Sequence, residues 1–165
     1  MADEVNVYKA QKWDVPLIKQ ENSNECWIVS YEMMYGYKKM PTSDVRTKLA
    51  AKGLDLNKRL VPADYSKARD AVGLTSYSVG HLKESWDNFA SLLAKVGPLW
   101  CVGTFLTTST GQAAHCLVVS GFDGGQKLRI NDPDYIYKNA NYDNMTYSDW
   151  CTKIAPLAFS CQCFA

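Results

Sequence analysis

We predict an α+β fold in which a helical half, about residues 20–96, packs against an antiparallel sheet built from about residues 97–165. In the first half, apolar residues recur at three- and four-residue steps, which is the spacing of a buried helix face. After residue 97, β-prone runs alternate with glycine-containing turns. The chain has no internal repeat and no linker-like tract, so we expect one domain over residues 1–165.

Four helices are expected in the first half, and each has a start or stop signal. The first covers about residues 24–38, with Asn24 or Ser23 as its N-cap, and its apolar pattern predicts a largely buried helix. The other three are expected near residues 43–52, 63–71 and 85–95, each stopped by a following glycine. Short strands are predicted at residues 5–8 and 74–79, with an extended lead-in over residues 14–20.

The second half is expected to be mostly strands. The β-prone runs cover residues 99–106, 116–122 and 127–131, and Asp123-Gly124-Gly125 is a strong hairpin signal between the last two. A late helix over residues 146–153 and a last strand over residues 157–161 complete the prediction.

Charge and hydropathy exclude several classes of protein. Eighteen basic and seventeen acidic residues leave a formal charge of +1, so we expect no nucleic-acid partner. No apolar run approaches the roughly 18–20 residues of a membrane span, so no membrane partner is expected either. The acidic start does not resemble a cleaved signal, which predicts synthesis in the cytoplasm with export, if any, by a leaderless, contact-dependent route.

The six cysteines do not form a metal-binding pattern, so neither a metal nor a cofactor is expected. Cys101 and Cys116 lie in apolar runs and are predicted to be small buried residues. Without a leader, reduced thiols are expected. A disulfide from Cys151 to Cys161 or Cys163 stays open as an alternative.

Cys26 is the candidate nucleophile because it lies in the first turn of a predicted helix. Unpaired N–H groups and the helix dipole at that end lower the pKa of a thiol. Gln20 precedes it by six residues, and its side-chain amide can donate a hydrogen bond to a developing oxyanion. The backbone N–H of Cys26 would supply the second donor.

His115 is the candidate base because it opens an apolar run that is typical of a central strand. The other histidine, His81, lies in a predicted loop without a partner pattern and is the weaker candidate. Asp132 follows the strand predicted at residues 127–131 and is expected to orient the imidazole. Successive side chains on a strand alternate, so either Asn131 or Asp132 can face His115, and we favour Asp132.

With these residues in place, the chain resembles the papain-like clan of cysteine peptidases. The resemblance spans about residues 14–136 and is nearest to the bacteriocin-leader peptidases and the papain-fold effector proteases of plant-pathogenic bacteria. Its motifs are Gln20 with Cys26-Trp27, Gly97-Pro98-Leu99, His115 with the strand after it, and Asn131-Asp132-Pro133. Ala114 departs from the glycine that many relatives have before the histidine. The resemblance implies the roles given above to Cys26, His115, Asp132 and Gln20.

The predicted function is therefore thiol-based hydrolysis of a protein, a peptide leader or a peptidoglycan stem peptide. The resemblance suggests a monomeric bacterial effector or toxin, with a cognate immunity or inhibitor protein as a further partner. Transamidation or side-chain deamidation would use the same acyl-enzyme, so the triad does not separate these reactions. A papain-fold domain kept only for binding is the non-enzymatic alternative.

Overall fold

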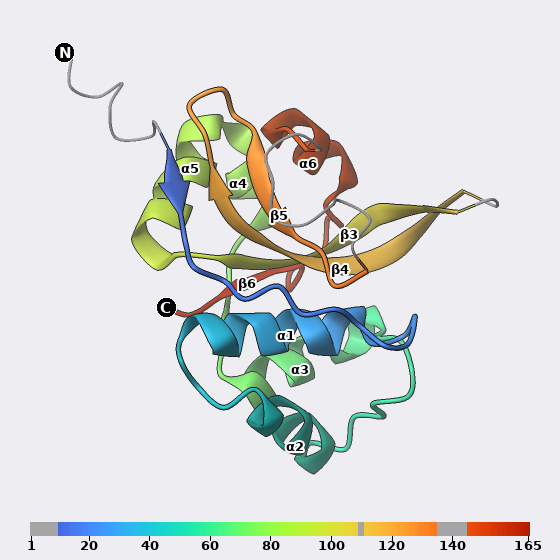
Figure 1. Cartoon of the computed structure of the whole chain (residues 1–165). Helices are drawn as coiled ribbons and strands as arrows, with labels where there is room; N and C mark the ends of the chain where they lie inside the picture. Colours follow the sequence, from blue (N-terminus) through green and yellow to red (C-terminus); the bar gives the residue numbers. More distant parts are fainter. Residues whose placement is uncertain (1–9, 109–110, 135–144) are drawn as a thin grey trace.

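Two long antiparallel strands, β3 (Leu99–Thr108) and β4 (Gly111–Phe122), form the centre of the sheet (Figure 1). The computed structural model describes residues 10–108, 111–134 and 145–165. Four shorter strands within these residues extend the sheet: β1 (Gln11–Lys12), β2 (Thr75–Ser76), β5 (Leu128–Asn131) and β6 (Cys161–Cys163). The order is β1-β4-β3-β6-β2, with β5 also paired to β4, and every pairing is antiparallel.

Helices lie on both sides of this sheet (Figure 1). On one side lie α1 (Cys26–Tyr37), α2 (Ser43–Ala51) and α3 (Tyr65–Val72). On the other side lie α4 (Val79–Glu84), α5 (Trp86–Val96) and α6 (Tyr147–Lys153). None of the helices in the described part of the chain is both long and apolar enough to cross a bilayer. The predicted α+β class is confirmed.

Helix α1 is the central element of its side and is buried over most of its surface, as predicted. The Tyr31 ring stacks on the Trp100 ring of β3, with centroids 4.8 Å apart and planes 4° apart. Tyr31 also donates a hydrogen bond to the Gln162 side chain at 2.8 Å, and Trp100 Nε1 donates to the Trp27 carbonyl at 3.3 Å. These contacts hold the first turns of α1 in register with the sheet.

Aromatic side chains fill the opposite side of the sheet. Phe89 of α5 packs on Trp150 of α6 with centroids 4.7 Å apart, and Trp86 meets Phe122 of β4 edge-on at 5.1 Å. Burial of such large rings contributes most of the apolar area in a core. The late helix predicted near residues 146–153 is therefore part of the core, and Thr146 caps it by accepting from Asp149 N–H.

Local signals account for several boundaries. Ser85 caps α5 by accepting from the Asn88 N–H at 3.0 Å, and Gly73 ends α3 with a φ of 77°, a conformation that favours glycine. Asp123 closes the predicted hairpin, because its Oδ1 accepts from Gly125 N–H and Lys127 N–H, both at 2.9 Å.

Other predictions were wrong. Helix α1 begins at Cys26 with Glu25 in the N-cap position, rather than Asn24 or Ser23. Only two residues of the strand predicted at 74–79 pair, and the next segment forms α4, so His81 is helical and not in a loop. Ser78 starts that helix by accepting from His81 N–H at 3.2 Å, a cap that the alternating pattern concealed.

The last strand is β6, and it begins where the strand predicted at residues 157–161 was expected to end. The reason is tertiary, because Cys161 and Gln162 pair with Cys101 and Trp100 of β3. All six cysteines are free thiols, so the alternative disulfide from Cys151 does not form. The strand predicted at residues 5–8 lies outside the described residues.

Candidate active site

Cys26 is the first residue of α1, and its backbone is fixed from two sides. Trp27, the next residue, donates its indole N–H to the Lys58 carbonyl at 3.1 Å, and its own carbonyl accepts from Trp100. The sulfur therefore lies at the positive end of a helix that cannot rotate freely on the sheet. Cys26 is 8% exposed, so the thiol is sheltered but reachable.

His115 lies on β4 opposite Gly103 of β3 and is 2% exposed. Its Nε2 is 2.5 Å from Asp132 Oδ1. This contact leaves Nδ1 as the ring nitrogen available to Cys26, whose thiol lines the same cavity and interacts electrostatically with the ring. A carboxylate that binds one imidazole nitrogen fixes the ring orientation and stabilises the imidazolium.

Asp132 and Asn131 point to different partners, as expected for successive residues at a strand end. Asn131 donates to the Val15 carbonyl at 3.0 Å and accepts from Ser120 Oγ at 2.6 Å, so its amide supports the lead-in segment. Asp132 reaches His115 and also accepts from Asp134 N–H at 3.0 Å. Of this pair, the structure brings Asp132 to the imidazole.

The Cys26 thiol has a pKa far below the usual value for cysteine. A hydrogen bond from the Cys116 thiol lowers the pKa of Cys26 most; burial opposes it, and His115 adds to the lowering, so the pKa is about 5. Burial alone would lower the pKa of His115, but Asp132 and Cys26 raise it to about 9. Between these values the pair is a thiolate and an imidazolium, the form in which thiol nucleophiles react.

Gln20 lies beside the sulfur, 7% exposed, on the loop that leads into α1. Its backbone N–H donates to the Pro133 carbonyl at 2.7 Å, which ties the loop to the residue after Asp132. Its side-chain Nε2 donates to the Asn22 carbonyl at 3.0 Å. The amide thus has a fixed orientation at the cavity that Cys26 also lines.

A narrow cavity of about 70 Å³ connects these groups. Gln20, Cys26 and His115 line it, and Asp132 lies behind the imidazole. The apolar part of its wall consists of Trp27, Leu60 and Val102, and charged side chains come from Arg59 and Asp134. The structure therefore brings the four predicted site residues together at one cavity or directly behind it.

Other residues differ in their relation to the site. His81 is exposed on α4, where it lies 3.6 Å from Glu84, and it does not line this cavity. Cys116 is buried as predicted, yet it contacts the Cys26 sulfur, a role that its apolar surroundings did not suggest. Successive side chains on a strand alternate in direction, so its position directly after His115 gave no signal of this role. Among the described residues, no group of three or more His, Cys, Asp or Glu could hold a metal ion.

Comparisons with known proteins identify the family and the fold of this chain. The model of the family described as "Papain-like cysteine protease AvrRpt2" matches residues 9–148. The chain also resembles a solved double glycine motif protease from an AMS/PCAT transporter in complex with the leader peptide, at 21% identity and a TM-score of 0.55. That alignment covers 93% of this chain and 91% of the other, so the two share a papain-like fold. No curated protein matches the chain.

Proposed function

This chain belongs to the AvrRpt2 family of papain-like cysteine proteases, and we propose that it hydrolyses peptide bonds with a Cys26–His115–Asp132 triad. Cys26 is the nucleophile, and His115 is the base and then the acid. Asp132 orients the imidazole. The Gln20 amide and the Cys26 backbone N–H form the oxyanion hole.

The relation between His115 and its two neighbours carries this proposal. One ring nitrogen meets a buried carboxylate at 2.5 Å, and the Cys26 thiol at a helix N-terminus lines the same cavity and raises the pKa of the ring. A nucleophile, a base and an orienting group in contact are the arrangement that activated thiols require. Packing of a cysteine side chain does not require a charged imidazole beside the thiol.

The reaction follows from these positions. The Cys26 thiolate attacks the scissile carbonyl carbon, and the oxyanion accepts hydrogen bonds from Gln20 and the Cys26 N–H. The His115 imidazolium gives its proton to the departing amine, so that the C–N bond breaks and a thioester remains. Water, deprotonated by His115, then attacks the thioester, so that the C–S bond breaks, the acid is released and the thiolate–imidazolium pair is restored.

The substrate that we propose is an extended segment of a protein or peptide with small side chains beside the scissile bond. The small volume of the cavity and its walls of Trp27, Leu60 and Val102 support this substrate class. The solved neighbour is named for a double glycine motif and was crystallised with a leader peptide, which agrees with a narrow site. Delivery into another cell as an effector or toxin is part of the proposal and rests on the resemblance to effector proteases.

The test compares the wild-type protein with Cys26→Ala on a proteome-derived peptide library, with products identified by mass spectrometry. We expect cleavage by the wild type, beside residues with small side chains, and none by Cys26→Ala. Cys151→Ala is the matched control, because Cys151 is a half-buried cysteine of α6 outside the cavity, and it should cleave normally. Cleavage by Cys26→Ala would refute the triad.

Intact-mass measurement of a treated target separates the reactions that share this acyl-enzyme. Hydrolysis yields fragments, whereas deamidation of a side chain adds about 1 Da and leaves the chain whole. At neutral pH, iodoacetamide should label Cys26 before the other five thiols, because its pKa is about 5. Equal labelling of all six would favour the binding-module alternative.

A further inference from the structure

The Gln20 amide can serve an oxyanion only if its donor keeps one direction. Its Nε2 carries two hydrogens, and one of them is bound to the Asn22 carbonyl at 3.0 Å. Its Oε1 is buried and has no hydrogen-bond partner among the described residues. The position of the Asn22 peptide therefore decides where the second N–H of the amide points.

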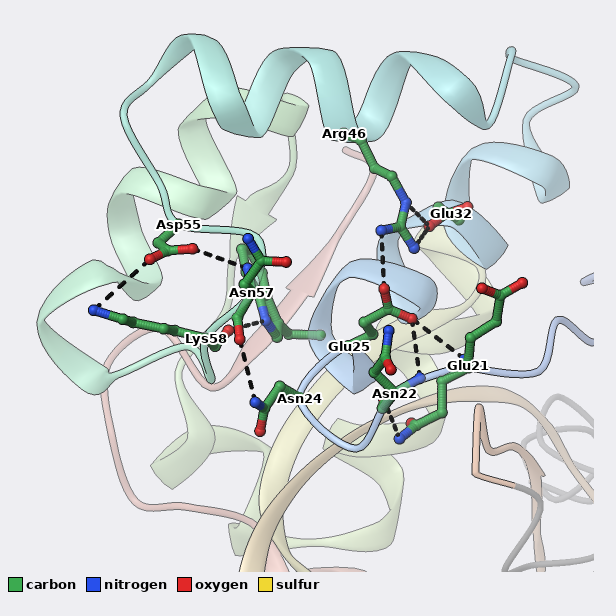
Figure 2. A network of polar contacts seen from close by, with 11 residues as sticks. Glu21, Asn22, Asn24, Glu25, Glu32, Arg46, Asp55, Asn57 and Lys58 are labelled. Atoms are coloured by element: carbon green, nitrogen blue, oxygen red, sulfur yellow. Dashed lines mark hydrogen bonds and ion pairs between the residues drawn. The ribbon is translucent and has the colours of Figure 1, made fainter.

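Glu25 holds the turn that contains this carbonyl from outside the cavity: its side chain binds the two peptide N–H groups before the carbonyl, and its backbone N–H binds the carbonyl itself. Its Oε2 accepts hydrogen bonds from the backbone N–H groups of Glu21 and Asn22, both at 3.3 Å (Figure 2). Its own backbone N–H donates to the Asn22 carbonyl at 3.1 Å, the same oxygen that binds the Gln20 amide. One residue thus fixes both ends of the turn between Gln20 and Cys26.

Arg46 of α2 holds the Glu25 carboxylate in place. Figure 2 shows its guanidinium between two carboxylates, those of Glu25 and Glu32. Arg46 Nη1 is 3.2 Å from Glu25 Oε1, and Nε and Nη2 are 3.1 Å and 3.0 Å from Glu32 Oε1. The two carboxylate side chains are only 12% and 14% exposed, so this ion pair is better shielded from solvent than a surface pair.

The Glu25 carboxylate stays charged within this cluster. Burial would raise the pKa of Glu25, but hydrogen bonds from Arg46 and Asn22 lower it, so the carboxylate stays ionised at neutral pH. The Arg46 guanidinium offsets that charge while the carboxylate binds the turn.

We propose that Glu25, held by Arg46, is a positioning residue of the oxyanion hole and acts through the Asn22 peptide on the Gln20 amide. The inference rests on the proposed function, because it assigns Gln20 to the oxyanion. It adds a second layer that reaches the reaction only through Gln20 and touches neither the sulfur nor the imidazole.

The experiment is a double-mutant cycle on kcat with a cleavable peptide, using Gln20→Ala, Glu25→Ala and the double variant. Removing one oxyanion donor costs about 10²–10³ in kcat, which is the upper bound for a residue that acts through it. We expect Glu25→Ala to lower kcat about 10-fold or more, with KM changed less than about 3-fold. In a protein that already carries Gln20→Ala, adding Glu25→Ala should lower kcat by less than about 3-fold.

Conservative variants keep the test independent of folding. Glu25→Gln retains an acceptor oxygen for the turn and should lose less kcat than Glu25→Ala. Arg46→Ala should lower kcat in the same Gln20-dependent way. The control is Lys67→Ala on α3, which breaks an exposed ion pair with Asp64 and should leave kcat unchanged. If Glu25→Ala fails to fold, the cycle is run with Glu25→Gln and Arg46→Ala.

Two results would overturn the inference. The first is an equal loss of kcat in the presence and absence of Gln20, and the second is full activity of Glu25→Ala. Failure of the proposed function would give other results. Cleavage by Cys26→Ala, or no cleavage by the wild type, would refute the triad itself. The labelling rate of Cys26 by iodoacetamide should stay within about 3-fold of wild type in Glu25→Gln, which separates an effect on the oxyanion hole from one on the thiolate.

Discussion

His115 Nε2 lies 2.5 Å from Asp132 Oδ1, and both side chains are almost completely buried. Buried charges need a partner, since an isolated ion in the interior is costly. The strand pairing of β4 with β5 brings them together, although seventeen positions separate them in the chain. This pair connects the fold to the chemistry, because the carboxylate determines which ring nitrogen faces the sulfur.

Asp132→Ala should therefore lower kcat more than Asp132→Asn. An asparagine oxygen still accepts from the ring N–H and keeps its orientation, but supplies no charge for the imidazolium. Replacing such a carboxylate with its amide costs up to about 10⁴ in kcat in a serine triad, so we expect a large loss for both variants and the larger one for alanine. Steady-state kinetics on one peptide measures both, and an equal loss would mean that orientation contributes nothing.

The activity should have a bell-shaped dependence on pH. In the proposed mechanism, cleavage uses the Cys26 thiolate, whose thiol has a pKa of about 5, and the His115 imidazolium, whose pKa is about 9. Activity should rise as pH increases through about 5, because the thiol loses its proton, and fall through about 9, because the imidazolium loses its own. The profile of kcat/KM against pH measures this, and a flat acidic limb would contradict the assignment of a low thiol pKa.

Cys116→Ala should raise the pKa of Cys26, because the Cys116 thiol makes the largest hydrogen-bond contribution to stabilising the thiolate. The acidic limb of the activity profile would then move to higher pH, while the basic limb, set by His115 and Asp132, would move less. The pH dependence of iodoacetamide labelling at Cys26 reports the shift directly. Cys151→Ala is the control and should leave the labelling curve in place.

Gly103→Ala should destabilise the fold. A Cβ at this position would collide with the Lys153 carbonyl oxygen and lie 2.9 Å from the Ile154 Cα, both of them backbone atoms of the segment that ends α6. Overpacking of this kind costs about 1–3 kcal/mol in free energy of unfolding. Because Gly103 pairs with His115, activity should fall as well.

Gly80→Ala is the matched control for that prediction. The nearest atom to a Cβ there is Ser78 Oγ at 3.7 Å, an ordinary contact, and the residue lies inside α4. Alanine should stabilise the helix by about 0.5–1 kcal/mol. Urea unfolding of both variants measures the two changes, and a Gly103→Ala protein as stable as Gly80→Ala would show that the α6 segment moves at little cost.

The features predictable from sequence are those that neighbouring residues control. Ser85 predicts the start of α5, and Asp123 predicts its hairpin, because each cap or turn is closed by a side chain within four residues. Glu25 was missed as the N-cap residue because its carboxylate binds Arg46 and the preceding turn instead of capping α1. Helix α4 was missed because residues 74–79 alternate like a strand, while Ser78, within that run, caps the helix that follows.

The sequence alone determined an α+β chain with a thiol at a helix start, a histidine on a strand and a carboxylate at a strand end, since periodicity and turn chemistry are local properties. Only the tertiary structure decided that Cys116 would touch the nucleophile, that Arg46 would hold Glu25, and that β6 would begin at Cys161. Such contacts join residues that are far apart in the chain: Arg46 and Glu25 are separated by 21 positions, and Tyr31 of α1 and Gln162 of β6 by 131. Packing selects such partners, and no short stretch of sequence contains both members of the pair.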